Sequence, residues 1–250
     1  MTTETGITKW FGVNLAILLS EKILQVYPQF DQETYVQTIK QQYRPLTYTQ
    51  RVELHANALK RTLVKEYPQA INILTRILGE PNPNQTGMFT QYYWVLPVAK
   101  FVEIYGLEHV DISLNAIEQI TQRCTGEYAI RPFIRHHPKK TLQKIKRWAQ
   151  SSDFHLRRLA SEGLRPKLPW ATKLDVFIDN PKPIFFILEL IKEDPVKFVQ
   201  KSVANCIADY LKVNPKQTLP LLKAWKASKH PSTQWICRHA TRNLKQYQIV

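Results

Sequence analysis

The segment Pro138-Lys-Lys-Thr-Leu142 is echoed 77 residues later by Pro215-Lys-Gln-Thr-Leu219. Each copy is followed at the same offset by a tryptophan, Trp148 in the first and Trp225 in the second. The spacing corresponds to two units of about 38 residues, and a period near 40 with two helices per unit is typical of HEAT-like repeats. The echo therefore predicts an all-α fold, an α-solenoid in which each helix pair buries its apolar face against its neighbours.

A second set of echoes marks the other helix of each predicted pair. Leu156-Arg-Arg-Leu-Ala160 is matched by Val199-Gln-Lys-Ser-Val203, 43 residues on, and by Ile236-Cys-Arg-His-Ala240, 37 residues after that. In such solenoids the second helices line the concave surface, so we expect a concave basic groove that suits a rod-like polyanion such as duplex DNA. The cations on these segments are Arg157, Arg158, Lys201 and Arg238.

Helix-period patterns dominate the chain, and no useful length of β-strand alternation interrupts them. Apolar residues step by 3, 4, 4 and 3 positions from Val196 to Tyr210, which places them on one face of a helix. Asp31 is positioned to cap another helix. Residues 81–87 form the clearest loop, but their length demands no domain boundary. We therefore expect a single domain of HEAT-like repeats over residues 1–250.

Charge is distributed unevenly between the two halves of that domain. Residues 1–130 carry 11 Lys and Arg against 12 Asp and Glu, whereas residues 131–250 carry 24 against 8. The whole net charge of +15 therefore belongs to the C-terminal half, a pattern typical of a polyanion-binding surface joined to a neutral half. The alternative interpretation of this charge is a generally basic, solvated surface that binds no particular polyanion. Anionic membranes are disfavoured, because the lysines are spread over many helices.

Membrane insertion and secretion are also disfavoured by the sequence. No apolar run approaches the roughly 20 residues of a membrane span. The cysteines Cys124, Cys206 and Cys237 are odd in number and far apart, which argues against a disulfide framework or a zinc site. We expect a cytoplasmic protein that uses no metal or other cofactor, and no feature of the sequence implies an obligate protein partner.

Three carboxylates stand out because they lie among arginines and lysines on segments that we interpret as helices. They are Glu127, Glu162 and Asp209. Glu162 lies four residues after Arg158, so a surface ion pair worth roughly a few tenths of a kcal/mol is the plain interpretation. Asp209 shares a polar stripe with Lys201 and Asn205, which is also typical of a solvated helix face.

The connector after Glu162 favours a functional site. Gly163 ends the predicted helix, and Pro166 and Pro169 restrict the path to Trp170, which is therefore presented at low entropic cost. A tryptophan beside a carboxylate can contact a sugar or a cationic base by cation–π attraction. A core tryptophan that fills the space between repeats is the alternative.

Carboxylates that converge on one basic groove suit a reaction with a cationic transition state. Glycosidic bond cleavage passes through an oxocarbenium-like state, which a carboxylate stabilises while it positions water. A base that is already cationic, such as an N-alkylated purine, needs no general acid in order to leave. The lack of a need for a general acid agrees with the rest of the sequence, which has no recognisable Ser-His-Asp triad, P-loop or Gly-rich dinucleotide loop.

The sequence resembles the AlkC branch of the AlkC/AlkD family of DNA alkylation-repair glycosylases over nearly its whole length. The most specific match is Arg157-Arg-Leu-Ala-Ser-Glu-Gly163, followed by Arg165-Pro166 and Leu168-Pro-Trp-Ala171. The resemblance implies HEAT-like repeats and the removal of cationic alkylated bases from double-stranded DNA, chiefly 3-methyladenine and also 7-methylguanine. Other matching segments are Gly87-Met-Phe89, Tyr93-Trp94, Phe101-Val102, Tyr105-Gly-Leu107, Asp111-Ile-Ser113, Thr121-Gln-Arg123, Gly126–Ile134, Lys201–Asp209 and Trp235–Ala240.

The resemblance also implies a role for each candidate residue. It implies that Asp209 is the catalytic carboxylate, which stabilises the sugar cation and positions water. It implies that Glu162 and Trp170 contact the lesion, that Glu127 lines the same site, and that Arg158 holds Glu162 or a phosphate. With the other cations of the basic half, the expected DNA contacts are Arg131, Arg135, Arg157, Arg158, Arg165, Lys167, Lys201 and Arg238.

Departures from the family pattern are modest. Cys124 stands where an aromatic residue is common, Gly126 where alanine is common, and Gln200-Lys201 where two arginines are common. Some relatives carry a C-terminal immunoglobulin-like domain, and none is expected in this chain, which stops at Val250.

A non-catalytic binder of damaged or branched DNA and a protein-binding HEAT scaffold are the alternatives to an enzyme. The presence of both Asp209 and Trp170 favours the enzyme.

Overall fold

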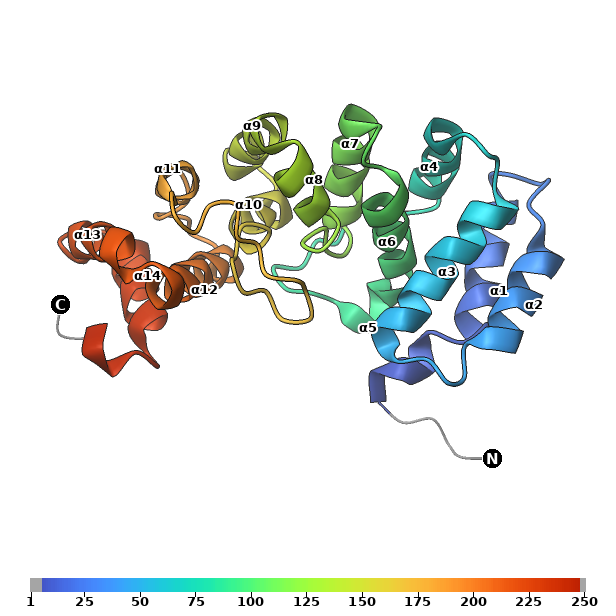
Figure 1. The fold of residues 1–250 in the computed structure, drawn as a ribbon, viewed down its shortest axis with the longest axis horizontal. Coiled ribbons are helices and arrows are strands. Elements are labelled where there is room, and N and C mark those ends of the chain that lie inside the picture. The colour runs from blue at the N-terminus through green and yellow to red at the C-terminus, as the bar shows by residue number, and fades with distance from the viewer. Residues whose placement is uncertain (1–5, 248–250) are drawn as a thin grey trace. The chain divides into compact units, whose positions relative to one another are not determined.

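A computed structural model describes residues 6–247, and every regular element in that range is a helix (Figure 1). The chain divides into two compact units. Unit 1 comprises residues 1–83 and 87–129, and unit 2 comprises residues 84–86 and 130–250. The boundary coincides with the point at which the charge balance of the sequence changes. None of the described helices combines the length and the apolar composition that a bilayer crossing requires.

Unit 1 contains helices α1 to α7. Helix α3 packs against α2 and α6, and α7 packs against α4 and α6. Asp31 caps α2 as predicted, because its carboxylate accepts a hydrogen bond of 3.0 Å from the backbone N of Thr34. Residues 81–87 form the predicted loop. The helices are α1 (Val13–Leu24), α2 (Gln32–Gln42), α3 (Tyr48–Thr62), α4 (Tyr67–Arg76), α5 (Phe89–Tyr92), α6 (Leu96–Tyr105) and α7 (Val110–Thr121), with 3-10 turns at Gly6–Trp10 and Tyr93–Val95.

Unit 2 contains helices α8 to α14. Most of them form pairs in which a first helix is followed by a second helix, and the second helices of successive pairs, α10, α12 and α14, pack against one another. The helices are α8 (Ile130–His136), α9 (Pro138–Ala149), α10 (Phe154–Glu162), α11 (Lys182–Glu189), α12 (Lys197–Val213), α13 (Pro215–Lys226) and α14 (Pro231–Thr241), with a 3-10 turn at Lys245–Tyr247.

The sequence echoes fall at equivalent positions of these pairs. The two Pro-Lys-x-Thr-Leu segments begin α9 and α13, where proline at the first helical position suits a helix start. Their tryptophans, Trp148 on α9 and Trp225 on α13, are both buried, with 2% of their surface exposed. The three echoes of the second set lie on α10, α12 and α14. The predicted all-α fold of HEAT-like helix pairs is confirmed.

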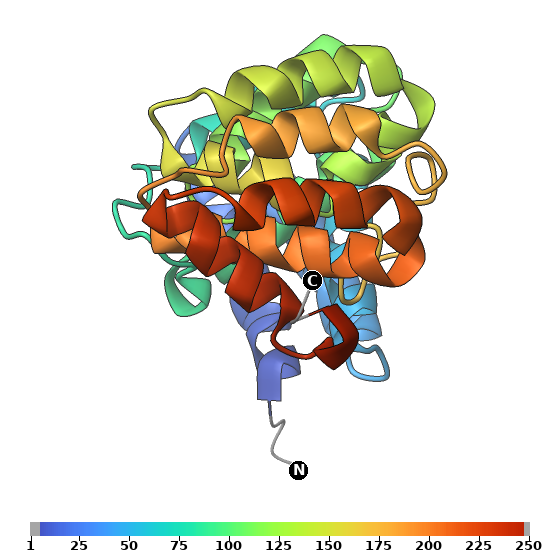
Figure 2. The same ribbon diagram turned by 90° about the vertical axis from the view of Figure 1, so that its left-hand side faces the viewer.

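Two rows of helices result within unit 2. The first-helix row consists of α9, α11 and α13, and the second-helix row consists of α10, α12 and α14 (Figure 1). Seen from the side in Figure 2, the helices of the first-helix row run roughly parallel, coloured from yellow-green to red. Helix α12 packs against both α10 and α14, and its predicted apolar face from Val196 to Tyr210 is buried throughout. Side chains of α10, α12 and the segments beside them therefore meet although they are about one repeat apart in sequence.

Candidate active site on helices α10 and α12

Arg165 joins two carboxylates that belong to neighbouring repeats. Its Nη1 lies 2.7 Å from Oε1 of Glu162, at the end of α10, and its Nε lies 2.9 Å from Oδ2 of Asp209, on α12. Each of the two acids is only 6% exposed. The structure thus brings together two of the three predicted acids. It also gives Arg165 a role that we did not predict, because the sequence shows only its spacing of three from Glu162.

Glu162 is fully engaged by its neighbours. Besides the contact with Arg165, Oε1 lies 3.8 Å from Nη2 of Arg158, and Oε2 accepts a hydrogen bond of 2.6 Å from Oγ of Ser202. Burial on its own would raise the pKa of Glu162, but the charges of Arg158 and Arg165 and these hydrogen bonds lower it below its usual value. Glu162 is therefore ionised at neutral pH, and it holds Arg165 in place.

Asp209 differs from Glu162 in both its contacts and the direction in which its pKa is shifted. Its Oδ2 accepts from Arg165, and no hydrogen bond to its Oδ1 is found among the residues that the structure describes. Burial raises the pKa of Asp209, and the hydrogen bond and charge of Arg165 oppose that rise. The pKa values of the two acids are thus displaced in opposite directions, which is typical of sites where carboxylates have different tasks.

Trp170 lies at the tip of the connector between α10 and α11. It is 78% exposed, so the alternative of a core tryptophan is wrong. Its φ of +60° is in the left-handed region, which costs a non-glycine residue on the order of 1 kcal/mol. The connector is closed on itself by a hydrogen bond of 3.0 Å from the backbone N of Leu174 to the carbonyl of Pro166. An exposed tryptophan on a strained but tied backbone indicates a binding role.

Arg131 and Arg135 support this connector from α8. Arg131 donates to the carbonyls of Arg165 at 2.8 Å and Thr172 at 2.7 Å, and it is only 2% exposed. Arg135 donates to Oγ1 of Thr172 at 2.6 Å and to the carbonyl of Lys173 at 2.9 Å. We expected both arginines to contact DNA. The structure corrects this expectation for Arg131, whose guanidinium is buried and holds the connector.

Arg157 is also held inside unit 2. Its Nε lies 2.5 Å from Oδ2 of Asp194, and its Nη1 donates to the carbonyls of Ser151 and Ser152. Asp194 in turn accepts from the backbone N of Val196, at the start of α12. Arg157 therefore links two repeats, and these bonds favour a structural role over the DNA contact that we expected. Residue type and spacing did not distinguish it from Arg158.

The remaining predicted DNA contacts lie at or near the surface of unit 2. Lys167 on the connector, Lys201 on α12 and Arg238 on α14 are exposed. Arg158 is half-buried, and its guanidinium lies 4.8 Å from the centre of the Phe198 ring as well as near Glu162. These four cations, together with Arg135 and Arg165, stay predicted phosphate contacts.

Glu127 lies in a turn, not on a helix as we predicted. Oγ1 of Thr125 donates to Oε2 of Glu127 at 2.9 Å, a local bond that favours a turn over a helix. Gly126 between them leaves no room for a side chain, because a Cβ there would lie 2.6 Å from Oγ1 of Thr121. Glu127 belongs to unit 1, whereas Glu162 and Asp209 belong to unit 2, and its part in the site stays a prediction.

Both rows of helices in unit 2 carry an excess of positive charge. The first-helix row carries nine Lys and Arg and one acid, whereas the second-helix row carries six Lys and Arg and two acids. The total charge of this half therefore does not identify the DNA-binding face. The second-helix row is distinguished instead by carrying its acids next to arginines.

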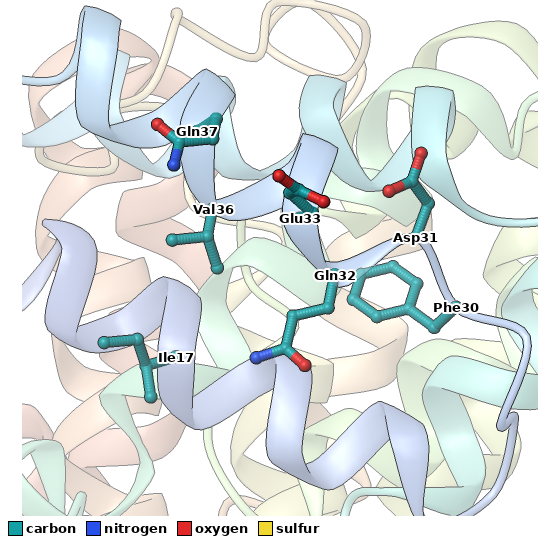
Figure 3. Close-up of a pocket in the computed structure, with 7 residues that line it drawn as sticks. All are labelled: Ile17, Phe30, Asp31, Gln32, Glu33, Val36 and Gln37. Carbon is teal, nitrogen blue, oxygen red and sulfur yellow. The ribbon is translucent and has the colours of Figure 1, made fainter.

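Other features of the described residues suit a reaction on DNA less well. Figure 3 shows a pocket on α1 and α2 of unit 1, whose two charged lining residues, Asp31 and Glu33, are both acidic. Such a lining repels phosphate. Over residues 6–247, no group of three or more His, Cys, Asp and Glu side chains is arranged to hold a metal ion.

Comparison with known proteins connects this arrangement to DNA repair. A family model described as DNA alkylation repair enzyme matches residues 122–244, which include most of unit 2. The uncharacterized protein YhaZ of Bacillus subtilis is 34% identical over 231 residues, covering 91% of this chain. The alkylpurine DNA glycosylase AlkC of Pseudomonas fluorescens, solved bound to DNA containing an abasic site analog, aligns over 97% of the chain with a TM-score of 0.86 and 30% identity. The chain spans 62% of the length of YhaZ and 66% of that of AlkC.

Proposed function

The chain belongs to the AlkC/AlkD-type family of DNA alkylation repair enzymes, and on that premise we propose that it is a DNA glycosylase. It hydrolyses the N-glycosidic bond of cationic N-alkylated purines in double-stranded DNA, with 3-methyladenine as the main substrate and 7-methylguanine as a further one. Its three cysteines are present as thiols, which suits the reducing cytoplasm as the place of action. The observation that carries the proposal is the buried pair Glu162 and Asp209 with Arg165 between them.

Asp209 is the catalytic carboxylate of the proposed reaction. As the bond between C1′ and the base nitrogen breaks, its electron pair stays with the base, which neutralises the positive charge of the alkylated purine. Positive charge then develops on the sugar, where the ionised Asp209 stabilises it. Water adds to C1′ and passes its proton to Asp209 or to solvent, which leaves an abasic sugar and a free base. No general acid is needed, because the leaving group departs as a neutral molecule.

Glu162 and Arg165 act as positioning residues. The carboxylate of Glu162 has partners on both of its oxygens, so it fixes the guanidinium that orients Asp209. Trp170 offers the exposed face of an indole to the cationic base or sugar, a contact worth about 0.5–2 kcal/mol. Glu127 is proposed to line the same site.

A non-catalytic DNA-binding protein is the second candidate, and one observation favours it. Arg165 partly neutralises both acids and joins two repeats, which is what a purely structural link also requires. The two candidates differ in the role of Oδ1 of Asp209. A catalytic carboxylate uses this oxygen, whereas a structural link does not.

Release of free methylated base from alkylated DNA tests the proposal. We expect wild-type protein to release 3-methyladenine faster than 7-methylguanine. Asp209→Asn should lower the single-turnover rate by roughly 10²-fold or more, because it removes the charge that stabilises the transition state. Asp179→Asn, at an exposed position of unit 2, is the matched control and should act like wild type. A rate for Asp209→Asn within about threefold of wild type contradicts the role of Asp209. Absence of base release from wild type favours the binding protein.

A further inference from the structure

Four side chains form a hydrogen-bonded ring that begins and ends on α12. Oγ of Ser202 donates to Oε2 of Glu162 at 2.6 Å, and Nη1 of Arg165 donates to Oε1 of the same carboxylate at 2.7 Å. Nε of Arg165 donates to Oδ2 of Asp209 at 2.9 Å. Ser202 and Asp209 are about two helical turns apart and lie on the same side of α12. The ring therefore connects Ser202 to the proposed catalytic carboxylate through two side chains.

The Ser202 hydroxyl has one proton, and its surroundings direct that proton to Glu162. Oγ of Ser161 lies 2.7 Å from Oγ of Ser202 and donates to it. A second acceptor near Oγ of Ser202 is the carbonyl of Arg158, at the longer distance of 3.4 Å. The 2.6 Å bond to the carboxylate has the length typical of a charge-assisted O–H···O⁻ bond. Ser202 is therefore a donor to charged Glu162, and Ser161 supports it in that direction.

Burial makes this hydrogen bond hard to replace. Ser161, Ser202 and Glu162 are all buried, so a carboxylate oxygen that lost its donor would not find water in its place. Burial raises the pKa of Glu162, whereas the charges of Arg158 and Arg165 and the hydrogen bond from Ser202 lower it. Ser202 thus favours the charged form of Glu162 without adding a charge of its own.

The strongest charges on the two acids come from α10, the connector and α12. Burial raises the pKa of Asp209, Arg165 and Lys212 oppose that rise, and the charge of Glu162 adds to it. Cys206, one turn before Asp209 on α12, is a neutral thiol, because burial and the nearby carboxylates raise its pKa well above 9.0. Protonation near the ring is therefore decided between two acids that share one guanidinium.

We propose that Ser202 is a positioning residue that keeps Glu162 charged while Asp209 takes up and releases a proton. The proposal rests on the proposed function, in which the water that bonds to C1′ passes a proton to Asp209, which then returns it to solvent. A transfer of that proton to Glu162 would neutralise the partner of Arg165 and loosen the guanidinium that orients Asp209. The hydrogen bond from Ser202 opposes this transfer because it stabilises the charged carboxylate.

NMR titration of isotope-labelled Asp and Glu side-chain carboxyls tests the order in which the two acids are protonated. Glu162→Gln and Asp209→Asn assign the two signals. In wild type, the protonation midpoint of Asp209 should lie above that of Glu162. Ser202→Ala should raise the Glu162 midpoint and narrow the interval between the two midpoints, because the carboxylate loses its donor. Ser202→Thr keeps the hydroxyl and should restore the wild-type interval.

Ser232→Ala is the matched control. It removes a buried serine hydroxyl of α14, which accepts a hydrogen bond of 3.0 Å from the neutral Nε2 of Gln200, and both midpoints should equal those of wild type. If Ser202→Ala does not fold, Ser202→Cys fills the same space with a weaker donor and should also raise the Glu162 midpoint.

An unchanged Glu162 midpoint in the Ser202 variant overturns the proposal, and so does an equal shift in Ser232→Ala. The titration needs no substrate, so it is independent of the release of methylated base. A wild type that releases no base, yet shows the expected midpoints, contradicts the glycosylase proposal alone and supports the effect of Ser202 on the two acids.

Discussion

Nε of Arg165 lies 2.9 Å from Oδ2 of Asp209, and this contact joins the connector after α10 to the middle of α12. The other arm of the same guanidinium reaches Glu162, so one side chain fixes the positions of both acids. Arg165 also limits how far burial raises the pKa of Asp209. The orientation and the protonation of the proposed catalytic carboxylate thus depend on one residue that need not touch the substrate.

Replacement of Arg165 by methionine should move the acid limb of the pH–rate profile. The proposed reaction needs ionised Asp209, so activity falls as the pH falls through the pKa of Asp209. Arg165 opposes the rise of that pKa, and its removal therefore shifts the acid limb to higher pH. Single-turnover base release across the acid range measures the shift. Arg238→Met is the control for the removal of a positive charge, and the acid limb of its pH–rate profile should match that of wild type. A rate that drops equally at every pH would indicate a structural role only.

Replacement of Trp170 by alanine should lower activity without lowering stability. The side chain is 78% exposed, so its removal disturbs little packing, whereas removal of a cation–π attraction of about 1–2 kcal/mol lowers the rate about tenfold. Trp148→Ala is the matched control, because that tryptophan is 2% exposed and its removal should cost about 3–5 kcal/mol of unfolding free energy. Thermal unfolding and base release measure both effects. A Trp170→Ala protein as unstable as Trp148→Ala would contradict the binding role.

Arg157→Ala should destabilise unit 2 and leave the salt dependence of DNA binding unchanged. The change leaves Asp194 buried without its ionic partner, which costs about 3–5 kcal/mol of unfolding free energy. Chemical unfolding measures the first effect, and the slope of log affinity against log salt measures the second. Because Arg157 and Asp194 act as a pair, Arg157→Ala and Asp194→Ala should not be additive in the double variant. A reduced slope of log affinity against log salt, together with normal stability of Arg157→Ala, would indicate instead that Arg157 contacts DNA.

The stabilising effect of Glu162 should disappear in acid. Its pKa is lowered in the folded state from an ordinary value of 4.5, so the folded protein binds this proton less tightly than the unfolded chain does. The contribution of Glu162 to stability is therefore complete above the unfolded-state pKa and is lost as the pH falls through the folded-state pKa. Chemical unfolding of wild type and Glu162→Gln should differ most near neutral pH and converge in acid. A difference that is independent of pH would refute this linkage.

The sequence by itself determined most of the helices, their pairing and the candidate residues for the proposed chemistry. Helix periodicity and capping are local properties, so the face from Val196 to Tyr210 and the cap at Asp31 followed from spacing alone. The repeat of about 40 residues placed Leu156 and Val199 on equivalent helices because each repeat buries the same apolar positions.

Only the tertiary structure decided which cations serve the fold and which face outward. Arg157 and Arg158 are adjacent in sequence, yet Arg157 is paired with Asp194, 37 residues away, and Arg158 lies near Glu162. Likewise Arg165 reaches Asp209 across 44 residues. Such pairs form because the stacking of α10 on α12 brings distant side chains within reach, and the length and direction of each side chain then determine its partner. The charges and their spacing in the sequence do not specify these contacts.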